Sequence, residues 1–299
     1  MRYDAIVVGG SYAGMAAALQ LVRARRTVRV IDAGQRRNRA AAHSHGFLGQ
    51  DGADPATIAR TARLQLEAYP TLAWRDGEVT DASGRKDDFT VRTREGGEYR
   101  ARRLLLATGV ADRLPAVEGL AERWGRSAFH CPYCHGYELD EGRIGVIGAV
   151  PMSAHQAMLL AEWGRVTFFP NGAVELDGQA ARELAERGVA VEPMRIAKID
   201  GHADVLLADG RRLSFAGLFT APRNAPSTPV AERLGCALME TPMGVQIRTG
   251  ETKETSVPGA YACGDVARVP HSISLAVADG AWAGAQVHQS LVWAAAGGA

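Results

Sequence analysis

The sequence lacks a long apolar run, an excess of charge of either sign and a framework of cysteines. No apolar run approaches the roughly 20 residues of a transmembrane helix, so no membrane partner is expected. Lys and Arg total 34 against 33 for Asp and Glu, which gives no electrostatic case for nucleic-acid binding. Four cysteines in 299 residues are too few for a disulfide scaffold.

The absence of a targeting signal points to the cytoplasm. The apolar start at residues 5–8 is too short for a signal-peptide core and runs directly into glycines. A hydrophobic content of 46% and a charged content of 22% are those of a soluble globular protein. The length allows one large domain or two ordinary ones.

Two strand–glycine–helix patterns organise the chain. The first predicts a strand over 3–8, a helix over 12–24 and a second strand over 28–31 that ends at Asp32. The second pattern begins with a strand and glycine turn at 143–148. Each pattern is a βαβ unit, which implies a parallel sheet. The further expected elements are a helix over 55–68, strands near 89–92 and 99–107, a helix over 153–163, strands over 165–169 and 217–221, a strand and turn over 259–265, and a helix over 273–295.

The first glycine turn has the form G-x-S-x-x-G and predicts a dinucleotide site. Gly9 permits a tight turn, Ser11 is a small residue facing the pyrophosphate, and Gly14 lets the helix pack closely on the strand. An acid at the end of the second strand is placed to bond a ribose hydroxyl. The predicted binding residues are Gly9, Gly10, Ser11, Ala13, Gly14 and Asp32.

A pair of cysteines, Cys131 and Cys134, lies between the two patterns in the sequence C-P-Y-C. Followed by His135 it also fits a c-type haem attachment, which requires export, and a zinc site would need a second ligand pair. Two packed structural cysteines are a further alternative. Thiol–disulfide catalysis is favoured, because His130 and His135 flank the pair and an imidazole exchanges protons near neutral pH.

Two more segments give the chain a family resemblance. An ATG turn (Ala107, Thr108, Gly109) and a GD motif (Gly264, Asp265) follow the order found in low-molecular-weight thioredoxin reductases, which the chain resembles over nearly its whole length. The resemblance implies an α/β fold of two Rossmann-like, doubly wound domains, a homodimer, and FAD as the first nucleotide, with Asp265 bonding its ribityl chain. It places the FAD domain at 1–111 and 223–299, with an inserted NAD(P)H-domain-like domain at 112–222 that carries the C-x-x-C.

The resemblance also implies roles around the dithiol. It assigns Cys134 to the flavin and Cys131 to the substrate, but His135 stands where those reductases have an aspartate. The pattern H-C-x-x-C-H-G-Y-E is similar to the dithiol oxidases that close disulfides in gliotoxin, holomycin and related products. In that group the matching positions for proton transfer are His130 and Asn38, although Asn38 is equally interpretable as a turn residue. His43 and His45 share its loop and could approach the flavin.

The second glycine turn departs from a working NADPH site. Val150 fills the middle glycine position and Pro151 removes a backbone N–H. After the next strand no basic residue occurs before Arg182, so an arginine clamp for the 2′-phosphate is missing there. The family's Arg-Gln pair after the GD motif is replaced by roughly Ile273 and Ser274. The alternative is that NADPH binds through other residues.

These observations predict an FAD-dependent dithiol oxidase. Its substrate would be a small-molecule or peptide dithiol, and its electrons would pass through the C-x-x-C and FAD to O2, giving H2O2. One rival is a disulfide reductase driven by NADPH or by ferredoxin. Another is a non-catalytic flavin redox sensor.

Overall fold

The structure is a computed structural model that describes residues 2–293, and its chain divides into two compact units. The first unit takes in the chain up to Arg37, Pro55–Ala111 and the chain from Ala225 onward. The second unit takes in Asn38–Asp54 and Asp112–Asn224. Residues 38–54, expected in the FAD domain, group instead with the inserted segment.

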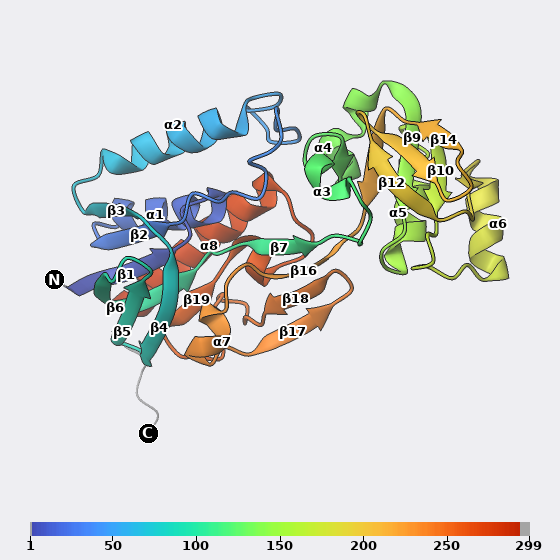
Figure 1. The fold of residues 1–299 in the computed structure, drawn as a ribbon. Helices are drawn as coiled ribbons and strands as arrows, with labels where there is room; N and C mark the ends of the chain where they lie inside the picture. The colour runs from blue at the N-terminus through green and yellow to red at the C-terminus, as the bar shows by residue number, and fades with distance from the viewer. Residues whose placement is uncertain (1, 294–299) are drawn as a thin grey trace. The chain divides into compact units, whose positions relative to one another are not determined.

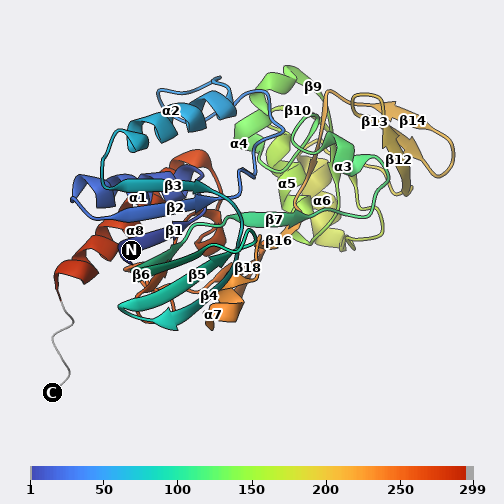
Figure 2. The same cartoon turned by 60° about the vertical axis from the view of Figure 1, so that its left-hand side comes forward.

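A seven-stranded sheet forms the centre of the first unit, in the order β3-β2-β1-β6-β5-β4 with β19 paired to β6 (Figures 1 and 2). Strand β1 pairs in parallel with β2 and with β6, and β19 pairs in parallel with β6. Strands β4, β5 and β6 form an antiparallel meander. The parallel part is therefore a βαβ fold whose turns share one edge. The strands are β1 (Arg2–Val8), β2 (Val28–Asp32), β3 (Leu72–Asp76), β4 (Val79–Arg85), β5 (Asp88–Thr93), β6 (Glu98–Leu106) and β19 (Ala260–Ala262).

The longer helices of this unit are α1 (Tyr12–Arg23), α2 (Pro55–Glu67) and α8 (Ile273–Val292). Helices α1 and α8 pack against each other with small and apolar buried residues on both. Ser272 caps α8 by accepting the Leu275 N–H at 3.1 Å. The sequence predicted this helix as far as residue 295; it ends at Val292, and residues 294 and 295 lie outside the described part.

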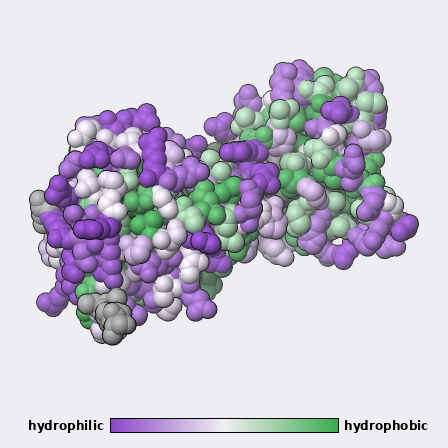
Figure 3. All heavy atoms as spheres, turned by 90° about the horizontal axis from the view of Figure 1, so that it is seen from below, coloured by the Kyte–Doolittle hydropathy of each residue, from purple (hydrophilic) through white to green (hydrophobic). Residues whose placement is uncertain are grey.

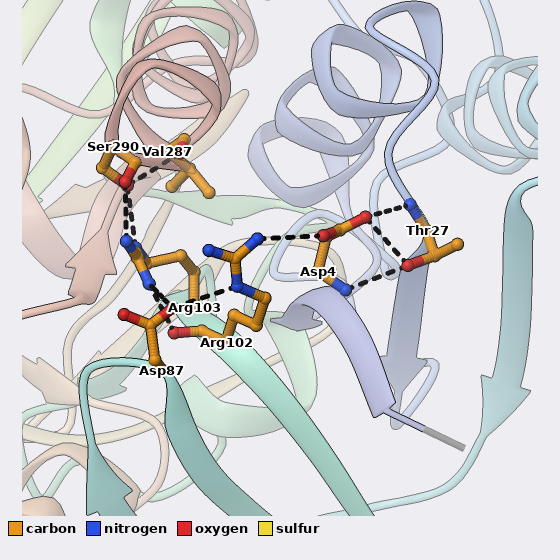
Figure 4. Close-up of polar contacts among 7 residues, drawn as sticks. All are labelled: Asp4, Thr27, Asp87, Arg102, Arg103, Val287 and Ser290. Carbon is orange, nitrogen blue, oxygen red and sulfur yellow. Dashed lines mark hydrogen bonds and ion pairs between the residues drawn. The ribbon is translucent and has the colours of Figure 1, made fainter. Parts of the chain in front are cut away.

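The core of the first unit lies between the sheet and the elements that cover it. Side chains such as Ile6, Phe89 and Leu104 are fully buried, and each contributes about 1.5–3 kcal/mol relative to an exposed position. Arg103 is also buried, with 1% of its surface exposed. It donates to Asp87 Oδ1 at 2.9 Å and to the Ser290 carbonyl at 2.6 Å, which ties the meander to the end of α8 (Figure 4).

The second unit is built on a five-stranded parallel sheet in the order β11-β10-β9-β15-β8 (Figure 1). Helix α5 leads from β9 to β10, as the sequence predicted, and starts at Met152. Two apolar clusters fill this unit, one of them beneath a small antiparallel sheet, β12-β13-β14. The elements are β8 (Ala128–Phe129), β9 (Glu141–Ile147), β10 (Gly164–Phe169), β11 (Ala190–Val191), β12 (Ile196–Asp200), β13 (Asp204–Leu207), β14 (Arg212–Ser214), β15 (Gly217–Thr220), α3 (Leu120–Arg123), α4 (Pro132–His135), η1 (Tyr137–Leu139), α5 (Met152–Leu160) and α6 (Gly178–Glu186).

A four-stranded sheet in the order β17-β18-β16-β7 completes the fold. Its strands are β7 (Val110–Arg113), β16 (Arg223–Pro226), β17 (Leu238–Thr241) and β18 (Gly244–Ile247), with α7 (Val230–Leu234) and the 3-10 helix η2 (Gly264–Ala267) nearby in the sequence. Strands β7 and β16 carry the chain between the two units.

The surface is mixed in polarity. Hydrophilic residues are spread over the face drawn in Figure 3, with smaller apolar areas between them. Over residues 2–293, no helix is both long enough and apolar enough to cross a bilayer.

Candidate functional site

The first glycine turn connects β1 to α1 and needs glycine at both ends. Gly9 has φ +100°, and a side chain there would collide with the Ala107 carbonyl oxygen. A Cβ on Gly14 would collide with the carbonyl oxygen of Gly9, so the helix starts directly against the turn. Within the described residues, Ser11 makes no capping side-chain bond to α1. The N–H groups of that first helical turn therefore face the space where a phosphate would bind.

Backbone hydrogen bonds align the predicted cofactor residues along one sheet edge. Gly9 N donates to Ile31 O at 2.8 Å, Ala107 N to Val8 O at 2.8 Å, and Cys263 N to Leu106 O at 3.0 Å. The glycine turn, the ATG turn and the GD motif thus stand side by side at the carboxyl ends of parallel strands, where α/β folds bind nucleotides.

Asp32 lies at this edge as predicted. Its Oδ1 accepts the Gly10 N–H at 2.9 Å, which fixes the carboxylate beside the glycine turn. The ATG turn is held from the other side, since Ser227 Oγ donates to Thr108 O at 2.7 Å. All of the predicted FAD-binding residues are therefore in one unit and at one edge.

The GD motif has polar partners that the sequence analysis missed. Arg37 Nη1 lies 3.1 Å from Asp265 Oδ2 and 2.8 Å from His271 Nδ1. Arg37 is separated from Asp265 by 228 residues in the sequence, so no local pattern could pair them.

A second ion pair lies beneath the same motif. Asp279 Oδ2 accepts the Gly264 N–H at 2.8 Å, and its Oδ1 lies 3.1 Å from Lys253 Nζ, with both side chains 11% exposed. Lys253 Nζ also donates to the Ala267 carbonyl at 3.3 Å. The pair fastens both ends of η2 and so fixes the turn that carries Asp265.

The first unit fits FAD on these observations. Its glycine turn leaves room only for backbone, its helix start presents N–H groups, and two carboxylates stand where a ribose and a ribityl chain would lie. When bound, FAD supplies a carrier for two electrons.

The second unit holds the dithiol. Cys131 and Cys134 form a disulfide with Cα atoms 5.3 Å apart, across the single turn of α4. Tyr133, between them, is 72% exposed and packs edge-on against Trp163. The other two cysteines, Cys236 and Cys263, are buried and free, and burial raises the pKa of the Cys263 thiol. They pack in the interior, in contrast to the half-buried disulfide pair.

The two flanking histidines differ. His135 stacks on Phe129 with ring centroids 4.1 Å apart, and burial, followed by the charge of His45, lowers its pKa to about 4. It is therefore neutral at neutral pH. His130 has its carbonyl bonded to Gln156 Nε2 at 2.7 Å, and its ring lies 6.1 Å from that of Trp124.

The loop at 38–54 belongs to the same unit as the dithiol. Asn38 Nδ2 lies 3.5 Å from Ser44 Oγ in this loop. His45 Nδ1 lies 3.3 Å from Glu138 Oε1, in η1 immediately after α4. The structure thus brings Asn38, His45, His130, His135 and the disulfide into one unit.

The second glycine turn, between β9 and α5, is closed by a side chain. Ser153 stands at the position of the last glycine of the motif, and its Oγ accepts the N–H groups of Ala149 at 3.0 Å and of Val150 at 3.2 Å. These are donors that a dinucleotide motif offers to a pyrophosphate.

A pocket of about 380 Å³ lies beside this turn. Its lining includes three arginines, Arg113, Arg195 and Arg223, together with Gly148 and Ala149. These arginines come from strands β7 and β16 and from the segment before β12, and not from the stretch after β10 where a phosphate clamp is expected.

Comparison with known proteins identifies the family of the chain. A model of the family described as "pyridine nucleotide-disulphide oxidoreductase" matches residues 3–280. The chain belongs to this family. It is a thioredoxin reductase-like, FAD-binding disulfide oxidoreductase, and the predicted α/β class with two dinucleotide-binding domains is confirmed.

Individual relatives agree with this assignment. The chain is 32% identical to "thioredoxin reductase sirT" of Leptosphaeria maculans, with 96% of this chain and 93% of that protein covered. The crystal structure of an oxidoreductase from Agrobacterium tumefaciens is 55% identical, with a TM-score of 0.95 and coverage of 98% of this chain and 99% of that one. The crystal structure of HlmI is 34% identical, with a TM-score of 0.89 and coverage of 97% and 92%.

Proposed function

We propose that this protein is an FAD-dependent dithiol oxidase that closes a disulfide in a small-molecule or peptide dithiol. The observation that carries the proposal is the second glycine turn. Its Val150 N–H, the counterpart of the Ser11 N–H in the first turn, is already bonded to Ser153, so a donor for an NADPH pyrophosphate is taken. The substrate dithiol is therefore the proposed source of the electrons that pass through the disulfide to the flavin.

The reaction at the disulfide is thiol–disulfide exchange. A substrate thiolate attacks Cys131 Sγ, which releases Cys134 as a thiolate and forms a mixed disulfide. The second substrate thiolate then attacks its own partner sulfur, so that Cys131 leaves and the substrate disulfide is complete. Two electrons and two protons pass from the substrate to the cysteine pair. Following the family resemblance, we assign Cys131 to the substrate and Cys134 to the flavin side.

Proton transfer accompanies both exchanges, because a free thiol with a pKa of about 8.5 is mostly protonated at neutral pH. His130 and Asn38 are the proposed participants by resemblance. His135 is a poor proton donor at neutral pH, since its pKa is lowered to about 4 by burial.

The cycle closes with O2 as the final electron acceptor and H2O2 as the second product, and the protein is a homodimer in this proposal.

The decisive experiment mixes the oxidised holoenzyme anaerobically with dithiothreitol and, separately, with NADPH, and records the flavin absorbance. We expect bleaching by dithiothreitol and none by NADPH, and peroxide from the dithiol once air is admitted. Cys134→Ser should abolish bleaching by the dithiol. Rapid bleaching by NADPH alone would overturn the proposal.

A second candidate is an NADPH-dependent disulfide reductase. The three arginines around the pocket beside the second glycine turn favour it, because arginine is the usual clamp for phosphate. Steady NADPH oxidation in the presence of a protein disulfide would support this function instead.

A further inference from the structure

The loop at 38–54 folds back on itself to present one imidazole. Ser44 N donates to Ala53 O at 2.9 Å, and Gly52 N donates to Ser44 O at 2.9 Å, so the loop closes as a short hairpin. Within it, Gly46 N donates to Asp51 Oδ1 at 2.8 Å. This closure holds the intervening residue, His45, in a fixed place.

His45 faces the segment that follows the disulfide. Its Nδ1 lies 3.3 Å from Glu138 Oε1 and 3.7 Å from Asp51 Oδ1, and its side chain is 19% exposed. Glu138 is only four residues beyond Cys134. The His43 ring lies 6.3 Å away, and the charge of His45 is felt by His135, the residue next to Cys134. His45 thus lies at the C-terminal flank of the disulfide.

The orientation of the ring decides its chemistry. A carboxylate on Nδ1 holds the proton there and leaves the lone pair on Nε2, which makes Nε2 the nitrogen that accepts a proton. His135, by contrast, is half-buried against Phe129 and has no carboxylate partner among the bonds that the structure gives it.

We propose that the His45–Glu138 pair, rather than His130 with Asn38, is the acid–base group of the dithiol, with Asp51 as a second carboxylate behind it. This inference rests on the proposed function and replaces the proton-transfer residues that the resemblance assigns. In the first exchange Nε2 takes the proton of the attacking substrate thiol, and the imidazolium returns it to the departing Cys134 thiolate. In the second exchange it takes the remaining substrate proton and delivers it to Cys131. Two protons move with two electrons, and the substrate becomes a disulfide.

The test measures the first half of the reaction alone. Oxidised holoenzyme is mixed anaerobically with dithiothreitol and quenched in acid, and newly formed thiols on Cys131 and Cys134 are counted by alkylation and mass spectrometry. The variants are His45→Gln and Glu138→Gln. His202→Gln is the matched control, because that imidazole belongs to the same unit but is exposed and bonded to the Ala216 carbonyl.

We expect His45→Gln to slow disulfide opening about 100-fold at pH 7 and Glu138→Gln about tenfold, with His202→Gln unchanged. The deficit should shrink as the pH rises toward about 9, because the dithiol then ionises without a base. A deficit of equal size at every pH, or a His45→Gln rate equal to that of the wild type, would overturn the inference. If dithiothreitol fails to open the wild-type disulfide, the proposed function itself fails, whatever the variants do.

Discussion

The two glycine turns of this chain have the same strand–turn–helix plan and opposite states. In the first, the last motif position is Gly14, which lies directly against Gly9, and Ser11 leaves the start of α1 uncapped within the described residues. In the second, the same position is Ser153, whose hydroxyl takes the two N–H groups of the turn. The Ser153 hydroxyl thus adds to the effects of Val150 and Pro151, which stand where the first turn has Ser11 and Tyr12.

The comparison also explains why the fold survives the change. A βαβ unit is held by the burial of its strands and helix, and residues such as Val146 and Ala157 are fully buried in the second unit. A turn that loses its ligand needs only a replacement for the lost hydrogen bonds. Ser153 supplies that replacement, so the second unit remains a stable support for the disulfide.

The largest effect is expected from copying the second turn into the first. Gly14→Ser places a Cβ where the carbonyl oxygen of Gly9 lies, so the turn must shift and FAD affinity should fall by at least about 100-fold. The measurement is the FAD absorbance retained per protein and a titration of the apoprotein. Ala16→Ser, on the same helix, should keep its flavin. A yellow Gly14→Ser protein with normal affinity would break the comparison.

The reverse exchange should open the second turn. In the double variant Val150→Gly and Ser153→Gly, the Ala149 N–H loses its internal acceptor and the middle position admits a phosphate. With Arg113 and Arg195 beside it, we expect NADPH affinity to rise about tenfold. Titration of NADPH fluorescence checks this. If the affinity does not change, the arginine-lined pocket has no relation to a nucleotide.

How far the sequence predicts the molecule depends on the range of the interaction. The strand and helix of the first turn follow from local apolar patterns, and β1, α1, β2 and α2 agree with the prediction within one or two residues. The prediction omitted β3 and β4, whose residues are mostly half-exposed and show no continuous apolar run.

The polar partners were beyond prediction for a different reason. Arg37 with Asp265, and His45 with Glu138, are far apart in the sequence and meet only after folding. The residue types were visible, but not their pairing. Ser153 was within reach of a local argument, because a serine at a motif glycine is a candidate cap for the N–H groups before it.

A third prediction concerns the first unit and tests whether the Lys253–Asp279 ion pair supports the GD turn. Lys253→Met leaves Asp279 buried without its cation and should cost about 3 kcal/mol of unfolding free energy. FAD affinity should also fall about tenfold, because Asp279 holds the Gly264 N–H. The matched control is Arg103→Met, which removes another buried cation together with its ion pair to the half-exposed Asp87, and should lose stability but keep its flavin affinity. Urea unfolding and FAD titration separate the two effects, and equal FAD affinity in both variants would contradict this role.

The smallest effect concerns the second unit and its pH dependence. Burial lowers the pKa of His135 to about 4, below the ordinary value of 6.5, so the unfolded chain binds a proton at a pH where the folded chain does not. This contribution to stability is complete above pH 6.5 and is lost as the pH falls toward 4, on the order of 3 kcal/mol in all. His135→Phe would keep a ring against Phe129 and remove the titration, so its unfolding free energy should fall less than that of the wild type between pH 7 and pH 5. Parallel pH dependence in the two proteins would mean that His135 reaches solvent in the folded state, and the contrast between a neutral His135 and a carboxylate-paired His45 would disappear.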